Sequence, residues 1–381
     1  MSLMNSDVAD ELAEHLRAGT TEMSETDLRV PISHFVSEER AAAERDLMTR
    51  LPVIIGHGSE LPPRGGFLTR EVLGVPLIVV RKADGSVGGY LNICRHRGGR
   101  VESEACGTKR ILRCNYHGWS YGRDDGRLRG VPYDDFYTHV DKERHGLHAI
   151  RVEERHGFLF ADLSGRQDWD VDDWLGPEVD AQLAPYGLDG AEIFLDRSFT
   201  LDINWKIVLD GAIDVLHPMF LHPHGVGKLI ETNTSVWRRY GRHGQSFSPR
   251  TRMGEKARAG EEVDASFRHM GSNLMLYPNS MVISTPDHVE FWTVWPDTTT
   301  AGRSTTQIRF LVRPEKRDER VEARMRRSWE ILEQAATDED WPMERTIQRN
   351  AEAYPYGTFL YGRNEQSCQH LHRELAADLG D

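Results

Sequence analysis

Cys94-Arg-His96 and Cys114-Asn-Tyr-His117 are the two segments that decide the fold of the first half of this chain. Each segment carries one cysteine and one histidine, and 17 residues separate His96 from Cys114. Thiolates combined with imidazoles suit zinc or an iron–sulfur cluster. A zinc finger usually takes two cysteines from one segment and two histidines from the other. One of each per segment favours a [2Fe–2S] cluster with both cysteines on one iron and both histidines on the other.

Glycines follow both segments, at Gly98-Gly99 and at Gly118, as loops that bend closely around a cluster require. Chance is a weak explanation, because the chain has four cysteines and two of them fall in these segments. A structural zinc site remains the alternative. The pattern therefore predicts a Rieske-type [2Fe–2S] centre held by the four cysteine and histidine residues of the two segments.

The two segments resemble the cluster-binding loops of Rieske non-heme iron oxygenases, specifically the terminal oxygenase alpha subunit of aromatic-ring-hydroxylating dioxygenases. The family usually has proline where Asn115 stands, a departure outside the ligands. The resemblance of these loops does not separate an oxygenase from a Rieske electron carrier. The length of 381 residues leaves room for a second domain of ordinary size.

Composition indicates a globular protein without a nucleic-acid or membrane partner. The chain is 39% hydrophobic and 28% charged, with a net charge of −13, which disfavours binding to anionic polymers or surfaces. No apolar run reaches the length of a membrane span, and no signal peptide is recognisable. Two of the four cysteines, Cys106 and Cys368, are left as free thiols. This usage argues against a disulfide framework and predicts a cytoplasmic location.

The segment around the cluster loops is basic within this acidic chain. Between Cys94 and Gly130 there are nine basic residues and four acidic ones, a local charge of +5. A solvated surface would account for the charge, but complementary fields also speed encounter with a partner. We therefore expect an acidic ferredoxin or reductase to dock here as electron donor.

The rest of the chain predicts an α+β protein with three parts. An N-terminal segment, residues 1–49, contains two helices over 7–18 and 37–50, and residues 50–165 form an all-β cluster domain. Residues 166–381 form the second domain, with antiparallel strands over 273–277, 280–284, 289–295 and 304–312. A long helix is expected to begin at Pro314. Residues 241–268 have little periodicity and are expected to form a mobile loop.

A second metal site is indicated by Asp210, Asp214, His217 and His222. The spacing of four and three puts the first three on one helical face, and Pro218 disfavours further helix at His217. The broken helix would let His222 turn back toward the same ion. A buried helix with a polar stripe is the alternative, although ionisable side chains are rarely buried unless they are paired or bind a metal.

The same segment follows Asn204-Trp-Lys and is similar to the mononuclear iron motif of the oxygenase family. The resemblance implies that His217 and His222 are iron ligands. It implies that Asp214 is a carboxylate bridging histidines of both metal sites, across subunits of a homotrimer. The sequence departs from the family pattern at Asp210-Gly211, which leaves the role of Asp210 open.

The third iron ligand comes from the C-terminal region in this family. Glu339-Asp340, eight residues before Gln348, resembles the family segment and singles out Asp340, with Asp338 as the rival. The family fold implies an antiparallel-sheet catalytic domain of helix-grip (START-like) type. The apolar residues expected to line the substrate site are Leu216, Met219, Phe220, Phe291 and Trp292.

The resemblance implies the terminal oxygenase of a Rieske system, which hydroxylates an aromatic or apolar small molecule with O2. It needs a [2Fe–2S] cluster, a mononuclear Fe(II), and electrons from NAD(P)H through a reductase or ferredoxin. Oxidative N- or O-demethylation is the alternative within the class, and a Rieske electron carrier is the alternative outside it. The substrate, mono- versus dioxygenation, and the presence of a small beta subunit are left open.

Overall fold

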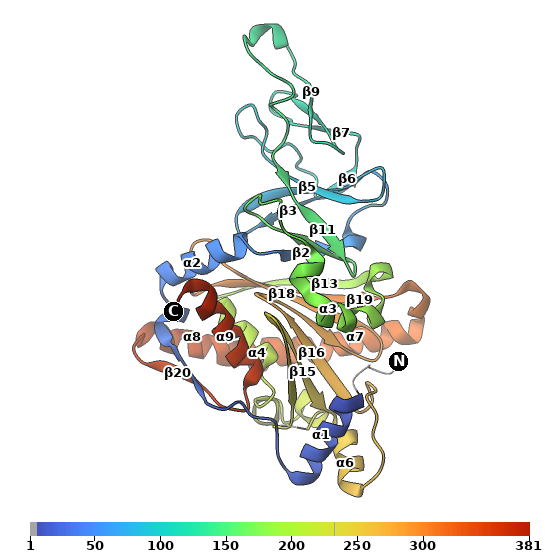
Figure 1. Cartoon of the computed structure of the whole chain (residues 1–381), viewed down its shortest axis with the longest axis vertical. Coiled ribbons are helices and arrows are strands. Elements are labelled where there is room, and N and C mark those ends of the chain that lie inside the picture. Colours follow the sequence, from blue (N-terminus) through green and yellow to red (C-terminus); the bar gives the residue numbers. More distant parts are fainter. Residues whose placement is uncertain (1–5, 232) are drawn as a thin grey trace. The chain divides into compact units, whose positions relative to one another are not determined.

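The computed structural model describes residues 6–231 and 233–381, which form two compact units (Figure 1). The cluster unit is Met48–Trp174, and the large unit joins the described residues before Met48 to Leu175–Asp381. Residues 6–47 therefore group with the C-terminal part of the chain, and the N-terminal segment 1–49 expected from the sequence stays a prediction. The sequence-based boundaries at 50 and 165 stay predictions.

The cluster unit is built from short antiparallel strands in three sheets, with the orders β10-β5-β4-β3-β6, β11-β12-β2 and β7-β8-β9. Its strands are β2 Val53–His57, β3 Gly66–Val72, β4 Val75–Arg81, β5 Val87–Leu91, β6 Cys106–Thr108, β7 Ile111–Arg113, β8 Ser120–Gly122, β9 Leu128–Gly130, β10 Ala149–Ile150, β11 Val152–Arg155 and β12 Phe158–Ala161.

Its hydrophobic core holds the cluster loops in place. Phe67, Ile78 and Leu112 pack in one cluster of buried residues that also contains Cys94 and Cys114. The two cysteines are therefore anchored by strands on either side of them in the sequence.

The large unit is centred on a seven-stranded antiparallel sheet with the order β13-β19-β18-β17-β16-β15-β14. Its strands are β13 Glu192–Leu201, β14 Val236–Tyr240, β15 His243–Pro249, β16 Met270–Leu276, β17 Ser280–Ser284, β18 Val289–Pro296 and β19 Ser304–Val312. A separate pair joins β1, Leu28–Pro31, to β20, Thr358–Tyr361.

The helices are α1 Ser6–Ala18, α2 Glu38–Thr49, α3 Val171–Leu183, α4 Trp205–Ile213, α5 Pro218–Leu221, α6 Thr251–Ala259, α7 Glu319–Gln334, α8 Trp341–Ala353 and α9 Gln366–Leu379. Helix α4 lies against α8 and α9 and also contacts β18 of the sheet (Figure 1). Among the described residues, no helix has the length and apolar character needed to cross a bilayer.

Two expectations about local structure are wrong. Residues 241–268 are not a mobile loop, because they contain β15 and α6; β15 buries polar residues such as His243 and Gln245, which obscured its period of two. The long helix does not begin at Pro314, which starts a short 3-10 turn. Helix α7 begins at Glu319, where Asp318 caps it by accepting a hydrogen bond from the Val321 N–H at 2.7 Å.

The acidic residues Asp338, Glu339 and Asp340, which follow α7, do not mark the end of a helix. A π-helical segment, Ala335–Asp340, joins α7 directly to α8. The negative charges therefore lie at a widened turn between two helices, where side chains can be aimed out of the regular helical path.

Candidate metal centres

The two cluster loops have the same backbone geometry. In each loop the cysteine N–H donates to the carbonyl five residues on, at 2.8 Å for Cys94 and 2.9 Å for Cys114. The cysteine carbonyl accepts from the glycine four residues on, at 2.9 Å in both loops. These glycines, Gly98 and Gly118, have φ angles of +78° and +74°, a conformation that other residues rarely adopt. The two loops therefore share one backbone conformation.

The four predicted cluster ligands lie together. Cys94 and Cys114 are buried. Burial raises the pKa of the Cys94 thiol, a hydrogen bond from Tyr121 lowers it, and the nearby charge of Cys114 raises it further, so the net shift is upward. The rings of His96 and His117 are 4.7 Å apart. This donor set fits a Rieske [2Fe–2S] cluster, with two thiolates and two imidazoles from two loops.

The Nε2 atoms of His96 and His117 each lie close to a hydrogen-bonding group. The Tyr137 hydroxyl lies 3.4 Å from His96 Nε2, and an Arg97 guanidinium nitrogen lies 2.8 Å from His117 Nε2. Nδ1 is therefore the ring nitrogen that each histidine can offer to a cluster.

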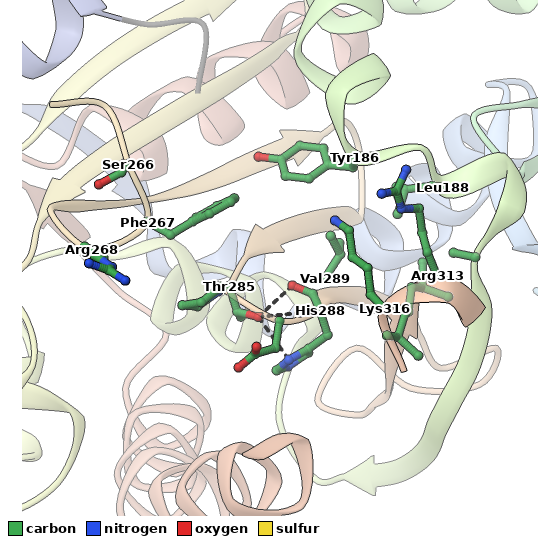
Figure 2. A pocket seen from close by; sticks show the side chains of 15 residues that line it. Tyr186, Leu188, Ser266, Phe267, Arg268, Thr285, His288, Val289, Arg313 and Lys316 are labelled. Atoms are coloured by element: carbon green, nitrogen blue, oxygen red, sulfur yellow. Dashed lines mark hydrogen bonds between the residues drawn. The ribbon is translucent and has the colours of Figure 1, made fainter. Parts of the chain in front are cut away.

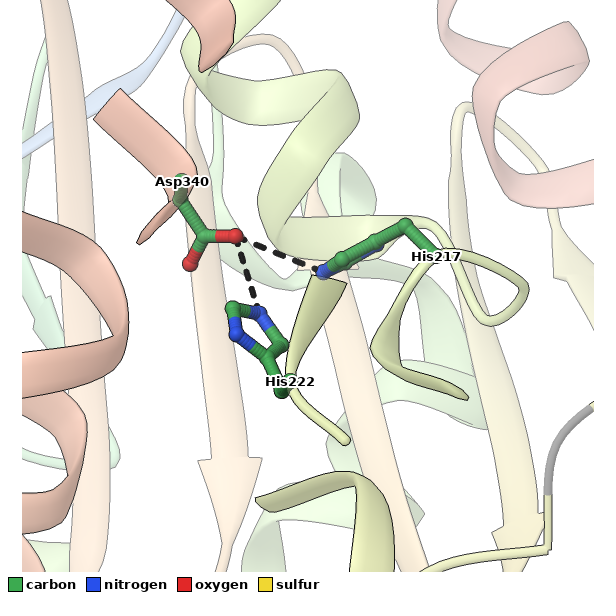
Figure 3. Close-up of side chains that lie close together, drawn as sticks. All are labelled: His217, His222 and Asp340. Carbon is green, nitrogen blue, oxygen red and sulfur yellow. Dashed lines mark ion pairs between the residues drawn. The ribbon is translucent and has the colours of Figure 1, made fainter. Parts of the chain in front are cut away.

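His217, His222 and Asp340 form a second group, in the large unit (Figure 3). Their donor atoms all lie within 4.8 Å of one another. Asp340 Oδ1 is 2.9 Å from His222 Nε2 and 3.6 Å from His217 Nε2. Two imidazoles and one carboxylate on one face are typical of non-heme Fe(II) sites. The rival Asp338 is not in this group; it is exposed and bonds Thr337.

The other ring nitrogen of each histidine bonds a carboxylate. His217 Nδ1 lies 3.0 Å from Asp214 Oδ2, and His222 Nδ1 pairs with Glu339 Oε2. Such partners fix the orientation and tautomer of a metal-binding histidine. Sequence reasoning missed Glu339, because it considered the Glu339-Asp340 pair only as a source of a ligand.

The break between α4 and α5 is stabilised by Asp214. Its carboxylate accepts from the backbone N–H groups of Leu216, at 2.8 Å, and His217, at 3.2 Å. Burial raises the pKa of Asp214, but hydrogen bonds from His217 and Leu216 outweigh it and leave the pKa below its usual value. Pro218 then starts the short helix α5, which ends at Leu221 and delivers His222 to the site.

Asn204 and Gln348 couple α4, which precedes the two histidines, to α8, which follows Asp340. Asn204 caps α4 by accepting from the Lys206 N–H at 3.0 Å, and its own N–H donates to Gln348 Oε1 at 3.0 Å. Gln348 belongs to α8, which begins immediately after Asp340. The helices that lead into the histidines and away from the aspartate are therefore tied together at a buried position.

Asp210, whose role the sequence left open, is held by the C-terminal region. The Tyr361 hydroxyl donates to Asp210 Oδ2 at 2.6 Å, and His372 Nε2 lies 2.9 Å from the same oxygen. His372 and Cys368 are buried, whereas Cys106 is exposed. Asp210 therefore has a structural anchor of its own and is not one of the three residues of the metal group.

A pocket of about 370 Å³ adjoins the metal group. Its lining includes His217, Asp340 and Asp214 together with Glu344. Burial raises the pKa of Glu344 well above the usual range, and the charges of Asp340 and Asp210 add to this effect. Glu344 Oε1 occupies the space beside Gly211, where a Cβ atom would come within 2.1 Å of it.

The five lining candidates from the sequence do not line this pocket. Met219 and Phe220 are 51% and 71% exposed, while Phe291 and Trp292 are buried on opposite faces of β18. A separate pocket of about 220 Å³ lies among Tyr186, Phe267 and Lys316 (Figure 2) and shares no lining residue with the first.

Comparison with known proteins agrees with this geometry. Residues 160–380 match the family described as ring hydroxylating alpha subunit (catalytic domain), and residues 52–139 match the Rieske [2Fe-2S] domain. The oxygenase subunit of glycine betaine monooxygenase from Pseudomonas aeruginosa is 26% identical over 348 residues, 81% of this chain and 79% of that protein. Its counterpart from Chromohalobacter salexigens is 34% identical over 187 residues, 49% of this chain and 41% of that protein.

Solved structures share the fold. A quaternary ammonium Rieske monooxygenase in complex with L-carnitine has a TM-score of 0.77 at 17% identity, over 99% of both chains. Naphthalene 1,2-dioxygenase from Rhodococcus sp. has a TM-score of 0.75 at 20% identity, over 100% of this chain and 99% of that one. The two matched domains imply a Rieske cluster, a mononuclear iron and O2 as co-substrate. The chain belongs to the family of ring-hydroxylating alpha subunits, the Rieske-type terminal oxygenases.

Proposed function

We propose that this chain uses O2 to hydroxylate a small organic molecule at an iron held by His217, His222 and Asp340. The observation that carries the proposal is the convergence of these donor atoms within 4.8 Å of one another. Three protein ligands on one face leave coordination positions for oxygen and substrate. Electrons would come from NAD(P)H through a reductase or ferredoxin and enter at a cluster bound by Cys94, His96, Cys114 and His117.

The bound metals would supply one-electron transfer and oxygen activation. The chain's own residues hold the ligands for that chemistry. Asp214 and Glu339 each accept a hydrogen bond at a histidine Nδ1, which leaves the Nε2 lone pairs of His217 and His222 directed toward the metal position. The buried link from Asn204 to Gln348 keeps Asp340 in register with the two histidines.

We further propose a homotrimer in which Asp214 connects the iron of one subunit to the cluster of the next. Tyr116, beside the cluster ligand His117, is 65% exposed. Met343 and Leu360, which line the pocket near Asp214, are 50% and 55% exposed. Apolar side chains at both sites would be covered by such an interface, and the basic cluster loops suit the carboxylates of that pocket.

The electron donor would be an acidic protein that docks on the cluster loops. Several basic residues of this segment are already paired, including Arg100 with Glu71 and Lys109 with Glu102. The donor would therefore meet a smaller positive surface than the charge count suggests, and its docking should weaken with salt. A small beta subunit stays an open question.

For the reaction, hydroxylation at an N-methyl carbon has the stronger support. The P. aeruginosa relative that spans 81% of this chain is a glycine betaine monooxygenase. Hydroxylation there yields an unstable hemiaminal, which releases formaldehyde and the demethylated amine. Ring hydroxylation of an aromatic compound is the second candidate, supported by the large subunit of anthranilate 1,2-dioxygenase from Burkholderia cepacia, 29% identical over 231 residues.

Metal analysis and turnover test the proposal. The purified protein should be red-brown, contain three irons and two sulfides per chain, and consume O2 with NADH, a reductase and substrate. Formaldehyde release identifies N-demethylation, and its absence with oxygen incorporated into a ring identifies the second candidate. Two irons per chain would point to an electron carrier, and a colourless zinc protein would overturn the whole reading.

A further inference from the structure

Glu344 lies on α8, one turn after the proposed iron ligand Asp340. A spacing of four residues puts two side chains on the same face of a helix, with Cβ atoms about 5–6 Å apart. Both residues line the pocket of about 370 Å³ beside the metal group, and so does Asp214. The Glu344 carboxyl group therefore belongs to the surroundings of the iron site, although it is not one of the three residues of the metal group.

The Glu344 side chain is buried without a partner for a negative charge. It is 6% exposed, and its Oε2 atom has no hydrogen-bond partner among the described residues. No lysine or arginine is among the residues described as lining this pocket, and the His217 ring already lies between Asp214 and Asp340. A carboxyl group buried without a counter-charge is stable in its protonated form. Burial accordingly raises the pKa of Glu344 well above its usual range, and the charge of Asp340 is a smaller cause.

The position of the Glu344 carboxyl group depends on Gly211 of α4. Its Oε1 atom occupies the space in which a side chain at position 211 would begin, since a Cβ atom there would lie 2.1 Å from it. Gly211 precedes Asp214 by three residues, which places the two on the same side of α4. The carboxyl group therefore reaches from the helix that follows Asp340 to the helix that precedes His217, and the missing side chain at position 211 leaves the room for it.

Hydroxylation by O2 consumes protons as well as electrons. Conversion of a C–H bond to C–OH takes up one O2, two electrons and two protons, and it releases one water. A proton donor for this reaction must be protonated, lie beside the metal group and be within reach of water. The pocket that Glu344 lines is large enough to hold water molecules, and its lining residue Met343 is 50% exposed. Glu344 meets these requirements.

We propose that Glu344 donates one of these protons to the oxygen atom that leaves as water. The carboxyl O–H bond breaks, its electron pair stays on the carboxylate, and the carboxylate regains a proton from water in the pocket. The electrons come from NAD(P)H through the cluster, as in the proposed function on which this inference rests. Because no cation balances the buried carboxylate, its reprotonation is favoured and the acid is restored for the next turnover.

The first test is the protonation state of Glu344, which does not depend on turnover. Infrared difference spectra of the anaerobic holoenzyme at neutral pH, wild type minus Glu344→Gln, should contain the carbonyl stretch of a protonated carboxyl group. Glu352→Gln is the matched control, because Glu352 is an exposed acid of the same helix. Its glutamine keeps an oxygen that can accept the hydrogen bond from Gln348 Nε2, and its difference spectrum should lack the band. Absence of the band for Glu344→Gln would overturn the inference.

The second test is a single turnover. Holoenzyme with a reduced cluster is mixed with O2 and glycine betaine, and formaldehyde is measured over time, with anthranilate and its ring-hydroxylated product as the parallel assay. Glu344→Gln keeps the shape of the side chain without an acidic proton, so product formation should slow by about 100-fold, with iron content and substrate binding as in the wild type. Gly211→Ala should also slow it, because the added methyl group would displace the Glu344 carboxyl group. Glu352→Gln should keep the wild-type rate.

The outcomes separate this role from the proposed function. A wild-type rate in Glu344→Gln, beside an active wild type, would overturn the role of Glu344 and leave the oxygenase proposal standing. Loss of iron in proportion to the loss of rate, in both Glu344→Gln and Gly211→Ala, would assign Glu344 a structural role and also overturn the inference. A wild type that consumes O2 with neither compound would contradict the proposed reaction itself, whatever the infrared spectra show.

Discussion

Glu339→Ala should weaken the mononuclear iron site without touching a proposed ligand. His222 is 2% exposed, and the Glu339 carboxylate bonds its Nδ1. Without that acceptor the ring can rotate, and the tautomer with a free Nε2 is no longer selected. Loss of such a partner typically costs 10- to 100-fold in metal affinity, which is about 1.4 to 2.8 kcal/mol. Because Glu339 is 30% exposed, water can replace part of the interaction, so we expect a value near the lower end.

The assay is Fe(II) titration of protein whose mononuclear site has been emptied while the cluster is intact, in competition with a chelator of known affinity. The cluster spectrum serves as the internal check of folding. Asp338→Ala is the matched control, because Asp338 is the adjacent exposed acid and should leave affinity within about twofold. Unchanged affinity in Glu339→Ala would refute the orienting role, and a large loss in Asp338→Ala would reassign the third ligand.

Three further outcomes are expected. His217→Ala or Asp340→Ala should abolish turnover and mononuclear iron binding while the cluster spectrum stays intact; full iron and activity in Asp340→Ala would exclude it as a ligand. Asp214→Asn should keep both metals, but its reduced cluster should reoxidise very slowly with O2 and substrate in stopped-flow absorbance, and rapid reoxidation would contradict the bridge. Lys206→Met should destabilise the protein by about 2 kcal/mol in urea unfolding, because it removes one of the two cations, 2.6 Å away, that pair with the buried Glu44 carboxylate and leaves Arg40 as the other; a loss below about 1 kcal/mol would contradict this.

The sequence predicted those strands and helices whose hydrophobic pattern lies entirely within the element. The boundaries of β17 and β19 agree with the expected strands at 280–284 and 304–312, because alternating or continuous apolar residues between breaks specify a strand locally. The prediction of a mobile loop over residues 241–268 was wrong because β15 buries polar side chains. Their hydrogen-bond partners lie on other elements, so the local pattern does not show that they are buried. His243 Nδ1, for example, accepts from the Tyr277 N–H at 3.1 Å.

The sequence by itself predicted the candidate metal ligands and identified the family, since Cys-x-His, Cys-x-x-His and Asp-x-x-His-x-x-x-x-His are short-range patterns that can be read along the chain. Tertiary structure decided which groups act on those residues. Glu339 meets His222 across 117 residues, and Tyr361 meets Asp210 across 151. Such contacts leave no periodic trace in the sequence, because a carboxylate that orients a histidine and one that faces solvent are the same residue until the chain folds.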